Sequence, residues 1–474
     1  MTEKKKRGCL RLCFKWGFRI FALLLVLVTG LFLYFFKDAL HTRFVLFPKQ
    51  AQAWSQLAAE RVDPGITTGW NEYRGVLHSH SELSHDSAIS FPEIVTALQK
   101  ADVDVICMTD HYEKGLADYS LGWNGIHDDI LFIRGYELNY GLMPWGIPED
   151  TVFSADEDPR ELAKRIRELG AVLFFSHTEQ ERMWDLPELE GMEIYNIHTD
   201  YLDEPKGIIQ ELLPHLLLSV KAYPQQSLRL IFDAPVDQLA RWDDLNKTRR
   251  ITGIAANDSH QNVGVRAFYT SDNTVILKGT GDKHKIMGEY KLNFVTRALL
   301  RAFFGALTPD EEFWRFELDA YHVSARHVST HILAKDLSEE SIIDSLRVGR
   351  TFVVFTAIAD GTGFVSYIEG PAGKVVMGES IAYEPGMELI AAAPNQCRFI
   401  LLRHGEEIAR AEGARATFTV PGPGKYRIET QLNILDEWTP WIYANPIDVT
   451  EAPVPAPVEE ETAVSEEEVS LIES

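Results

Sequence analysis

Cysteine is scarce in this sequence, and basic residues are too few to balance the acidic ones. The 474 residues include four cysteines, too few to indicate a disulfide framework: Cys9, Cys13, Cys107 and Cys397. Lysine and arginine number 46 against 70 aspartates and glutamates, which gives a formal net charge of −24. Binding to the phosphate backbone of a nucleic acid needs a basic surface. We therefore expect no nucleic-acid partner.

Long hydrophobic runs are also missing, with one exception near the N-terminus. Residues Ile20–Phe36 read IFALLLVLVTGLFLYFF and carry no charge. As a helix this run is about 25 Å long, close to the lower limit for the hydrocarbon core of a bilayer. Aromatic residues at both ends suit the two interfaces. The run predicts one transmembrane helix.

The charges around this run predict its orientation. Seven basic residues precede it, whereas only three follow it closely: Lys37, Arg43 and Lys49. The positive-inside rule then places the N-terminus in the cytoplasm and the chain after Lys37 outside, in the periplasm or extracellular space. A cleavable signal peptide is the alternative, but the run is longer than a usual signal core and no small-x-small cleavage site follows. We therefore expect a single-pass anchor in the cytoplasmic membrane.

The region after the anchor alternates short apolar runs with amphipathic segments. Helices are predicted at Phe91–Ala101, with Pro92 in its first turn, and at Pro159–Leu169, with Asp158 as its cap. Strands that alternate with helices favour a parallel sheet covered on both faces, either open or closed into a barrel. The predicted strands are Val103–Met108, Ile130–Ile133, Ala171–Phe175, Met192–Tyr195 and Ile251–Ala256.

The texture of the sequence divides the chain into segments. After Gly349, short β-type runs separated by glycine and proline are typical of an all-β sandwich, and the last residues are rich in glutamate and proline, as in a disordered tail. The predicted division is a basic cytoplasmic segment (1–19), a transmembrane helix (20–36), a stalk (37–70), an α/β domain (71–349, with an insertion at 265–310), a β-sandwich (350–450) and an acidic tail (451–474).

Nine of the fifteen histidines lie between His78 and His260, and most of them follow predicted strands. The carboxyl ends of parallel strands face one crevice, so side chains at those ends converge although they are far apart in sequence. A single histidine after a strand is usually structural, but five or six such signals together predict a site. The residues at strand ends are His78 and His80, Asp110 and His111, Glu137, His177, His198, and Asp258 and His260.

Imidazoles and carboxylates in one place suit borderline or hard divalent ions such as Zn, Mn or Fe. The set is larger than one or even two ions need, so three ions with shared carboxylates fit it best. The predicted cofactors are two to three divalent ions. Water that bridges two such ions becomes hydroxide near neutral pH, and the ions neutralise charge in the transition state. Neither a G-x-S-x-G elbow nor a C-x-x-C pair is present, and this chemistry needs neither.

The motifs LHSH, SHD, TDH, GYEL, FFSH, NIH and NDSH between Tyr73 and Asn262 resemble, in this order, the PHP (polymerase and histidinol phosphatase) superfamily of metal-dependent hydrolases. Two later segments, SLRVGRTFV (Ser345–Val353) and PWIYANPIDV (Pro440–Val449), are similar to the carbaryl-hydrolase-like branch. The resemblance implies a distorted (β/α)7 barrel of the PHP type, followed by a small Ig-like β-sandwich.

The resemblance also implies how the ligands divide among three ions. Glu137 would bridge the first two, His85 is ranked ahead of its neighbour Asp86 as a ligand of the third, and catalytic roles fall to Glu137, Asp110 and Asp258. Asp110 can instead orient His111. The implied groups are His78, His80, Glu137 and Asp258 for one ion, Glu137, His177 and His198 for the second, and His85 or Asp86, His111 and His260 for the third.

These features predict a membrane-anchored phosphoesterase that acts on a phosphomonoester or phosphodiester through a metal-bridging hydroxide at a trinuclear site. A hydrolase of carboxylic or carbamic esters is the alternative enzyme, and a cell-envelope binding protein with a structural metal cluster is the alternative of another class. The substrate would be a small molecule or a cell-envelope ester. A phosphate substrate needs cationic partners, for which Arg134, Arg182 and Arg266 are the candidates.

Overall fold

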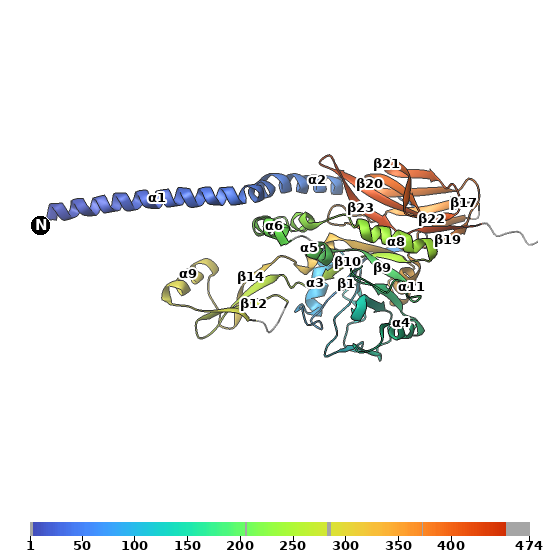
Figure 1. The fold of residues 1–474 in the computed structure, drawn as a ribbon, viewed down its shortest axis with the longest axis horizontal. Helices are drawn as coiled ribbons and strands as arrows, with labels where there is room; N and C mark the ends of the chain where they lie inside the picture. Colours follow the sequence, from blue (N-terminus) through green and yellow to red (C-terminus); the bar gives the residue numbers. More distant parts are fainter. Residues whose placement is uncertain (1–2, 204–205, 282–285, 372, 452–474) are drawn as a thin grey trace, which may run out of the picture.

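The computed structural model describes residues 3–203, 206–281, 286–371 and 373–451, without the side chains of residues 3–13 and 201–211. The acidic tail predicted at 451–474 thus lies almost wholly outside the described residues. The chain forms one body with a long N-terminal helix that projects from it (Figure 1). The elements of the body are a ring of strands with covering helices, an insertion, and a β-rich C-terminal region.

The projecting helix carries the apolar run. Helix α1 (Glu3–His41) continues through a π-helical turn, η1 (Thr42–Leu46), into α2 (Phe47–Glu60). Among the described residues, the helical stretch Phe14–Glu60 is the one candidate that is long and apolar enough to cross a membrane. The large apolar side chains of its outer part, such as Leu23 (71% exposed) and Val26 (70% exposed), face solvent. Such exposure of apolar surface is unfavourable in water and favourable in lipid.

The segment predicted as a stalk does not stand free. Trp54 of α2 is buried in the main core cluster, and Phe47 packs on Tyr223 with ring centroids 5.7 Å apart. The backbone N–H of Val62 donates to Pro394 O at 2.8 Å. The free energy gained by burying these aromatic side chains exceeds the conformational entropy that a flexible linker would keep. Helix α2 is therefore part of the body.

Seven strands of the α/β part pair in a closed order. Strands β8, β9, β10, β1, β2 and β5 lie side by side in parallel, and β6 pairs antiparallel with β8. An isolated bridge between Gly135, just after β5, and Trp145 of β6 joins the two ends of this series. The bounds are β1 (Asn71–Ser79), β2 (Val105–Cys107), β5 (Ile130–Ile133), β6 (Leu142–Trp145), β8 (Val172–Phe175), β9 (Gly191–Asn196) and β10 (Thr252–Ser259).

Helices and short strands connect and cover this ring. The predicted helix Phe91–Ala101 is confirmed as α3, where Ser90 and Glu93 form a capping box and Ile94 and Leu98 are fully buried. Asp158 caps α4 as predicted. The other elements of this part are β3 (Leu116–Asp118), β4 (Gly125–His127), η2 (Asn139–Gly141), β7 (Val152–Ser154), α4 (Pro159–Glu168), α5 (Ile197–Asp203), α6 (Lys206–Ser219), α7 (Pro224–Leu228), η3 (Arg229–Ile231), α8 (Val236–Thr248), α10 (Tyr321–His327) and α11 (Glu339–Val348).

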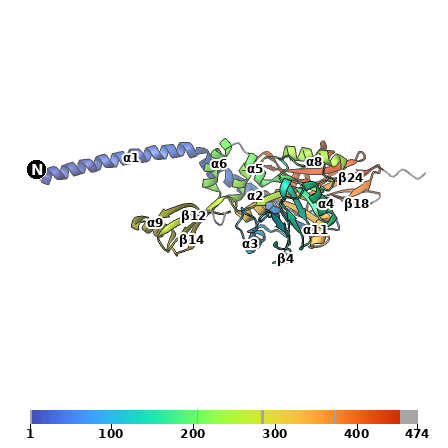
Figure 2. The same cartoon turned by 60° about the horizontal axis from the view of Figure 1, so that its bottom comes forward.

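An insertion follows β10 and has its own four-stranded sheet in the order β13-β12-β11-β14. Because β14 pairs antiparallel with β11, the insertion continues to Glu317, past the predicted limit of residue 310. It projects from the same end of the body as α1, in both views (Figures 1 and 2). Its elements are β11 (Gly264–Tyr269), β12 (Thr274–Gly279), β13 (Ile286–Lys291), α9 (Phe294–Phe304) and β14 (Glu311–Glu317).

The C-terminal β-rich region is hydrogen-bonded to the ring. Strand β15 pairs with β1, β16 pairs with β15, and β23 pairs with β16. Asn445, within the sequence PWIYANPIDV, accepts from Gly253 N and donates to Thr351 O, at 2.8 and 3.0 Å. The bounds are β15 (Ser329–Ala334), β16 (Thr351–Val354), β17 (Val365–Gly370), β18 (Gly373–Val376), β19 (Ser380–Ala382), β20 (Glu388–Arg403), β21 (Glu406–Thr419), β22 (Gly424–Ile434), β23 (Glu437–Ala444) and β24 (Ile447–Thr450).

Candidate metal centre

The predicted site residues converge at one rim of the ring. His78 lies near the carboxyl end of β1, His177 follows β8, and Asp258 lies near the end of β10. Glu137 comes after β5, at a bridge where its neighbour Tyr136 pairs with Asp110. The neighbouring parallel strands bring these side chains within contact distance across 180 residues of sequence.

Glu137 lies among three histidines. Its Oε2 atom is 3.3 Å from His78 Nε2 and 3.6 Å from His111 Nδ1, and its Oε1 atom is 3.3 Å from His177 Nε2. Ser176 Oγ donates to the same Oε1 at 2.7 Å, which fixes the carboxylate. A carboxylate whose two oxygens face different imidazoles has the geometry that a bridging ligand requires.

Asp258 makes a similar set of contacts. Its Oδ1 atom is 3.2 Å from Nε2 of both His78 and His80. Its Oδ2 atom is 3.0 Å from His198 Nδ1 and 3.5 Å from His177 Nε2. Asp258 therefore touches residues from three other strand ends, and its two oxygens face different imidazoles, as those of Glu137 do.

The structure places Asp86, and not His85, in the cluster. Asp86 Oδ2 is 3.2 Å from His260 Nε2 and 3.6 Å from His111 Nε2. His85 is exposed, and its ring lies beside His111 with centroids 5.1 Å apart. The ranking of His85 ahead of Asp86 is therefore reversed. Both residues lie in a turn, where Asp86 is half-buried beside the cluster and His85 is exposed.

Four groups of these side chains have ligand atoms within 4.8 Å of one another. They agree with the predicted division where His78 and His80 meet Glu137. They differ in that His80 also joins the third predicted group, and His198 joins Asp258 rather than Glu137. The groups are His80, Asp86, His111 and His260; His78, His177 and Asp258; His78, His80 and Glu137; and His198, Asp258 and His260.

The donor atoms fit divalent cations. His78 Nε2, His80 Nε2 and both carboxylate oxygens of Asp258 are buried and take part in no hydrogen bond. Buried polar atoms without such partners are costly, and each of these belongs to a type that ligates Zn, Mn or Fe. Cations held by the groups to which these residues belong would give such atoms a partner.

The protonation of the histidines also bears on metal binding. Burial and the neighbouring His260 lower the pKa of His80 to about 3, which leaves its ring neutral. Burial also lowers the pKa of His177, but its contacts with Glu137 and Glu179 raise that pKa to about 11. Only a neutral imidazole binds a metal ion, so an ion that binds at His177 displaces a proton.

Three of the clustered residues have a backbone conformation that is rare for residues other than glycine. The φ angles of His78, His177 and Asp258 are 66°, 45° and 46°. Such left-handed conformations cost free energy in a histidine and are kept where the surroundings hold them, which is commonly at functional sites.

Glu193 supports the cluster and was missed by the sequence reasoning. It lies within β9 and is fully buried. Its Oε1 atom is 2.5 Å from His78 Nδ1, and its Oε2 atom accepts from the backbone N–H of His177 at 2.8 Å and from Asn196 Nδ2 at 2.9 Å. A carboxylate on the second ring nitrogen orients a ligating histidine. The detectable signal was an acidic residue inside an apolar strand, GMEIYN.

Asp110 belongs to a supporting network instead of the cluster. It accepts hydrogen bonds from Ser81 N at 2.6 Å, Ser81 Oγ at 2.9 Å and Ser84 Oγ at 3.1 Å, and burial raises its pKa to about 6. Ser84 Oγ in turn lies 3.0 Å from His80 Nδ1. The described groups that could hold an ion do not include Asp110. Asp110 thus reaches the cluster through Ser84 and His80, and its predicted catalytic role stays a prediction.

A cavity of about 350 Å³ opens over the cluster, and Arg182 lines it together with Glu137 and His177. Arg182 Nε donates to Ser176 O at 2.9 Å, which holds the guanidinium there. A Cβ atom at Gly141, whose φ is +75°, would overlap this guanidinium. Three arginines were proposed as anion partners: Arg134, Arg182 and Arg266. Among the described residues that line this cavity, Arg182 is the only one of the three.

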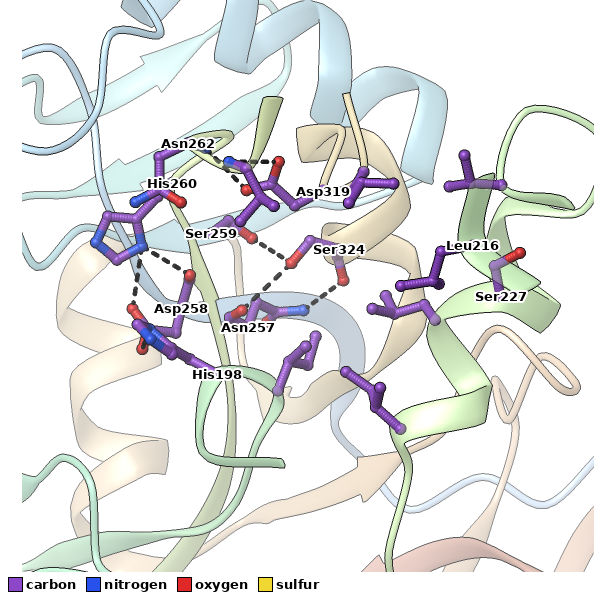
Figure 3. A pocket seen from close by; sticks show the side chains of 16 residues that line it. His198, Leu216, Ser227, Asn257, Asp258, Ser259, His260, Asn262, Asp319 and Ser324 are labelled. Carbon is purple, nitrogen blue, oxygen red and sulfur yellow. Dashed lines mark hydrogen bonds and ion pairs between the residues drawn. The ribbon is translucent and has the colours of Figure 1, made fainter. Parts of the chain in front are cut away.

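A second cavity, of about 140 Å³, has three of the cluster residues in its wall (Figure 3). Figure 3 shows His198, Asp258 and His260 on one side and Leu216 and Ser227 on the other. Leu216 of α6 and Leu228 of α7 form part of the apolar wall, together with Val220, which follows α6, and Ile231 of η3.

Two comparisons with known proteins found a match, to a family model and to a solved structure. No curated protein matches the chain. One solved structure that matches is a two-domain protein from Bacteroides vulgatus ATCC 8482 that contains a predicted PHP-like metal-dependent phosphoesterase. It is 12% identical, covers 82% of this chain and 98% of its own, and has a TM-score of 0.33, which is too low to carry a functional argument. Residues 77–237 match the family model of the PHP domain, and this part of the chain holds most of the clustered residues.

Proposed function

We propose that this protein is a membrane-anchored, metal-dependent phosphoesterase that hydrolyses a phosphomonoester or phosphodiester. The observation that carries the proposal is the buried set of imidazole and carboxylate atoms without hydrogen bonds, open to a cavity that contains Arg182. The PHP domain supports a metal site here. Two to three divalent ions, Zn, Mn or Fe, fit this number of ligands.

The ligands we assign are His78, His80, Asp86, His111, Glu137, His177, His198, Asp258 and His260. When bound, the ions supply a Lewis acid for the ester oxygen and acidify the attacking water. Glu137 and Asp258 hold the histidines of separate strands at fixed spacing. Glu193 keeps the second nitrogen of His78 protonated, so that its Nε2 faces the cluster. Arg182 binds an equatorial oxygen of the substrate and stabilises the charge that develops there.

The proposal extends to the architecture around the site. Residues 71–349 form a distorted (β/α)7 barrel, and residues 350–450 form an Ig-like sandwich. Helix α1 anchors the protein in the cytoplasmic membrane, with the basic N-terminal segment inside and the enzyme in the periplasm or extracellular space. The length and exposed apolar surface of α1 support an anchor.

Arg182 discriminates between phosphate and carboxylic or carbamic esters. A neutral ester needs no cation beside the metals, whereas a phosphate gains a charge-assisted hydrogen bond from a guanidinium. We expect Arg182→Ala to lower kcat/KM for chromogenic phosphate esters by roughly 10²-fold, the usual cost of one transition-state donor. The measurement is a panel of phosphomonoester, phosphodiester and carboxylester substrates with the Mn²⁺-loaded or Zn²⁺-loaded enzyme.

Arg134→Ala is the matched control, because Arg134 donates to Tyr119 O at 2.6 Å and does not line the cavity. That variant should retain the rate of the unmodified enzyme on every substrate. Hydrolysis of carboxylesters alone, with no dependence on Arg182, would replace the phosphoesterase proposal by the alternative one.

A further inference from the structure

The first inference concerns the second cavity and rests on the proposed function. Several polar groups in its wall are engaged in hydrogen bonds, whereas Asn257 Oδ1 and Ser227 Oγ have no such partner. Asn257 Nδ2 donates to Ser324 O at 2.9 Å and to Val328 O at 2.8 Å, and Ser259 Oγ donates to Ser324 Oγ at 2.7 Å. What the wall offers a ligand is therefore mainly hydrocarbon, some of it from Leu216 of α6 and Leu228 of α7.

The position of this cavity connects the cluster with the anchor. Its inner wall contains His198, Asp258 and His260, so a group in the cavity lies beside any ester bound at the cluster (Figure 3). Its outer wall contains Leu216 of α6, and α6 packs against α1 and η1 at the base of the projecting helix. Figure 1 shows α6 at the end of the body from which α1 leaves.

From this arrangement we infer that the substrate is a phosphorylated amphiphile. Its phosphate ester binds at the cluster, and its apolar group fills the cavity between β10 and helices α6 and α7. An apolar group gains free energy in proportion to the area it buries, and this gain is available only to an ester that carries one.

The test compares ethyl and hexyl esters of whichever phosphate class the enzyme cleaves, with the full chain in nanodiscs and Mn²⁺ supplied. Both esters dissolve as monomers, so micelles do not confuse the comparison. We expect kcat/KM for the hexyl ester to exceed that for the ethyl ester by about tenfold or more. Leu216→Trp, which fills the cavity, should remove this preference.

Leu217→Trp is the matched control, since Leu217 is the next residue of α6 and is 50% exposed. It should keep the preference for the hexyl ester. Equal kcat/KM for the two esters in the unmodified enzyme would overturn this inference and leave the proposed function intact. Failure to cleave any phosphate ester would overturn both.

A second inference rests on a different feature, the outer face of α9. Six apolar residues follow the i, i+1, i+4, i+5 spacing of one helix face: Phe294, Val295, Ala298, Leu299, Ala302 and Phe303. None of the residues of α9 is buried, and Phe294 and Phe303 are 78% and 81% exposed. The opposite face holds Phe304, which packs on Phe313 of β14 with centroids 5.3 Å apart. The apolar face thus points away from the insertion.

The position and charge of α9 indicate which partner its apolar face would contact. The insertion and α1 project from the same end of the body in both views (Figures 1 and 2). Helix α9 has two arginines, Arg297 and Arg301, and no acidic residue. We propose that α9 lies in the surface of the bilayer that α1 spans, with its apolar face among the lipids. A basic amphipathic helix with exposed phenylalanines binds anionic bilayers in this way.

A probe at residue 303 tests this placement. The full chain with Cys9→Ser, Cys13→Ser and Phe303→Cys is labelled with an environment-sensitive fluorophore and placed in nanodiscs of phosphatidylethanolamine and phosphatidylglycerol. We expect emission at shorter wavelength than in water and loss of emission with nitroxide-labelled lipids. The buried Cys107 and Cys397 should not react.

Val236→Cys in α8 is the control, because Val236 is 67% exposed and lies on the body. Its probe should emit as in water and be insensitive to the lipid nitroxides. The same behaviour at residue 303 would overturn the proposal. A shielded but unquenched probe at 303, with two chains in each nanodisc, would overturn it in favour of contact between two copies.

Discussion

Glu137→Gln should reduce turnover by roughly 10³-fold while the fold persists. The amide keeps the shape of the side chain and its hydrogen bond from Ser176. It removes the negative charge that faces His78, His111 and His177, so that cations are held less closely. The measurement is kcat on the best phosphate ester, with circular dichroism to verify the fold. A variant that turns over at the original rate would refute the assignment of Glu137 as a bridging ligand.

Glu193→Gln provides the comparison that separates ligation from orientation. Glu193 contacts His78 Nδ1 at 2.5 Å, on the side of the ring that faces away from the cluster. Loss of such a partner usually weakens metal affinity by about 10–100-fold. Excess Mn²⁺ or Zn²⁺ should therefore restore the activity of Glu193→Gln, whereas it should not restore that of Glu137→Gln.

Removal of metal should abolish activity entirely. The clustered imidazoles and carboxylates could hold metal ions, and the proposed attacking water loses its proton near neutral pH only when such ions are bound. Elemental analysis of the purified chain should find two or three equivalents of transition metal. Dialysis against a chelator should remove both the metal and the activity, and added Mn²⁺ or Zn²⁺ should return them together.

Asp86→Asn tests the third ion separately, because Asp86 contacts His111 and His260 but not Glu137. We expect this variant to lose about one equivalent of metal, while His85→Asn should retain the full content. One equivalent or none in the unmodified protein would contradict the multinuclear site.

Most of the site could be predicted because it depends on local patterns joined by one general rule. His78, His177 and Asp258 each end or follow a short apolar run, and parallel strands bring such ends together. The strands themselves were recognisable for the same reason: Ile130–Ile133 is confirmed as β5 with the same bounds. Helix α3 was recognisable from its cap and apolar spacing.

What could not be predicted depends on contacts between distant segments. The choice between His85 and Asp86 is decided by the path of a loop that contains no regular element. Glu193 looks like an error in an apolar strand until His78 is placed 2.5 Å from it. Trp54 reads as part of a polar stalk, and only its packing partners in the body show that it belongs to the core.

The hydrogen-bonded path from β1 through β15 and β16 to β23 bears on how the molecule melts. Asn445 reinforces it through hydrogen bonds with the backbone N–H and C=O of Gly253, five residues before Asp258 on the same strand. Two parts that share one ladder and such hydrogen bonds gain most of their stability jointly, and local opening at their junction would expose both interiors. We therefore expect the C-terminal region and the ring of strands to unfold in one transition. The rim that carries the cluster should unfold only together with the C-terminal strands.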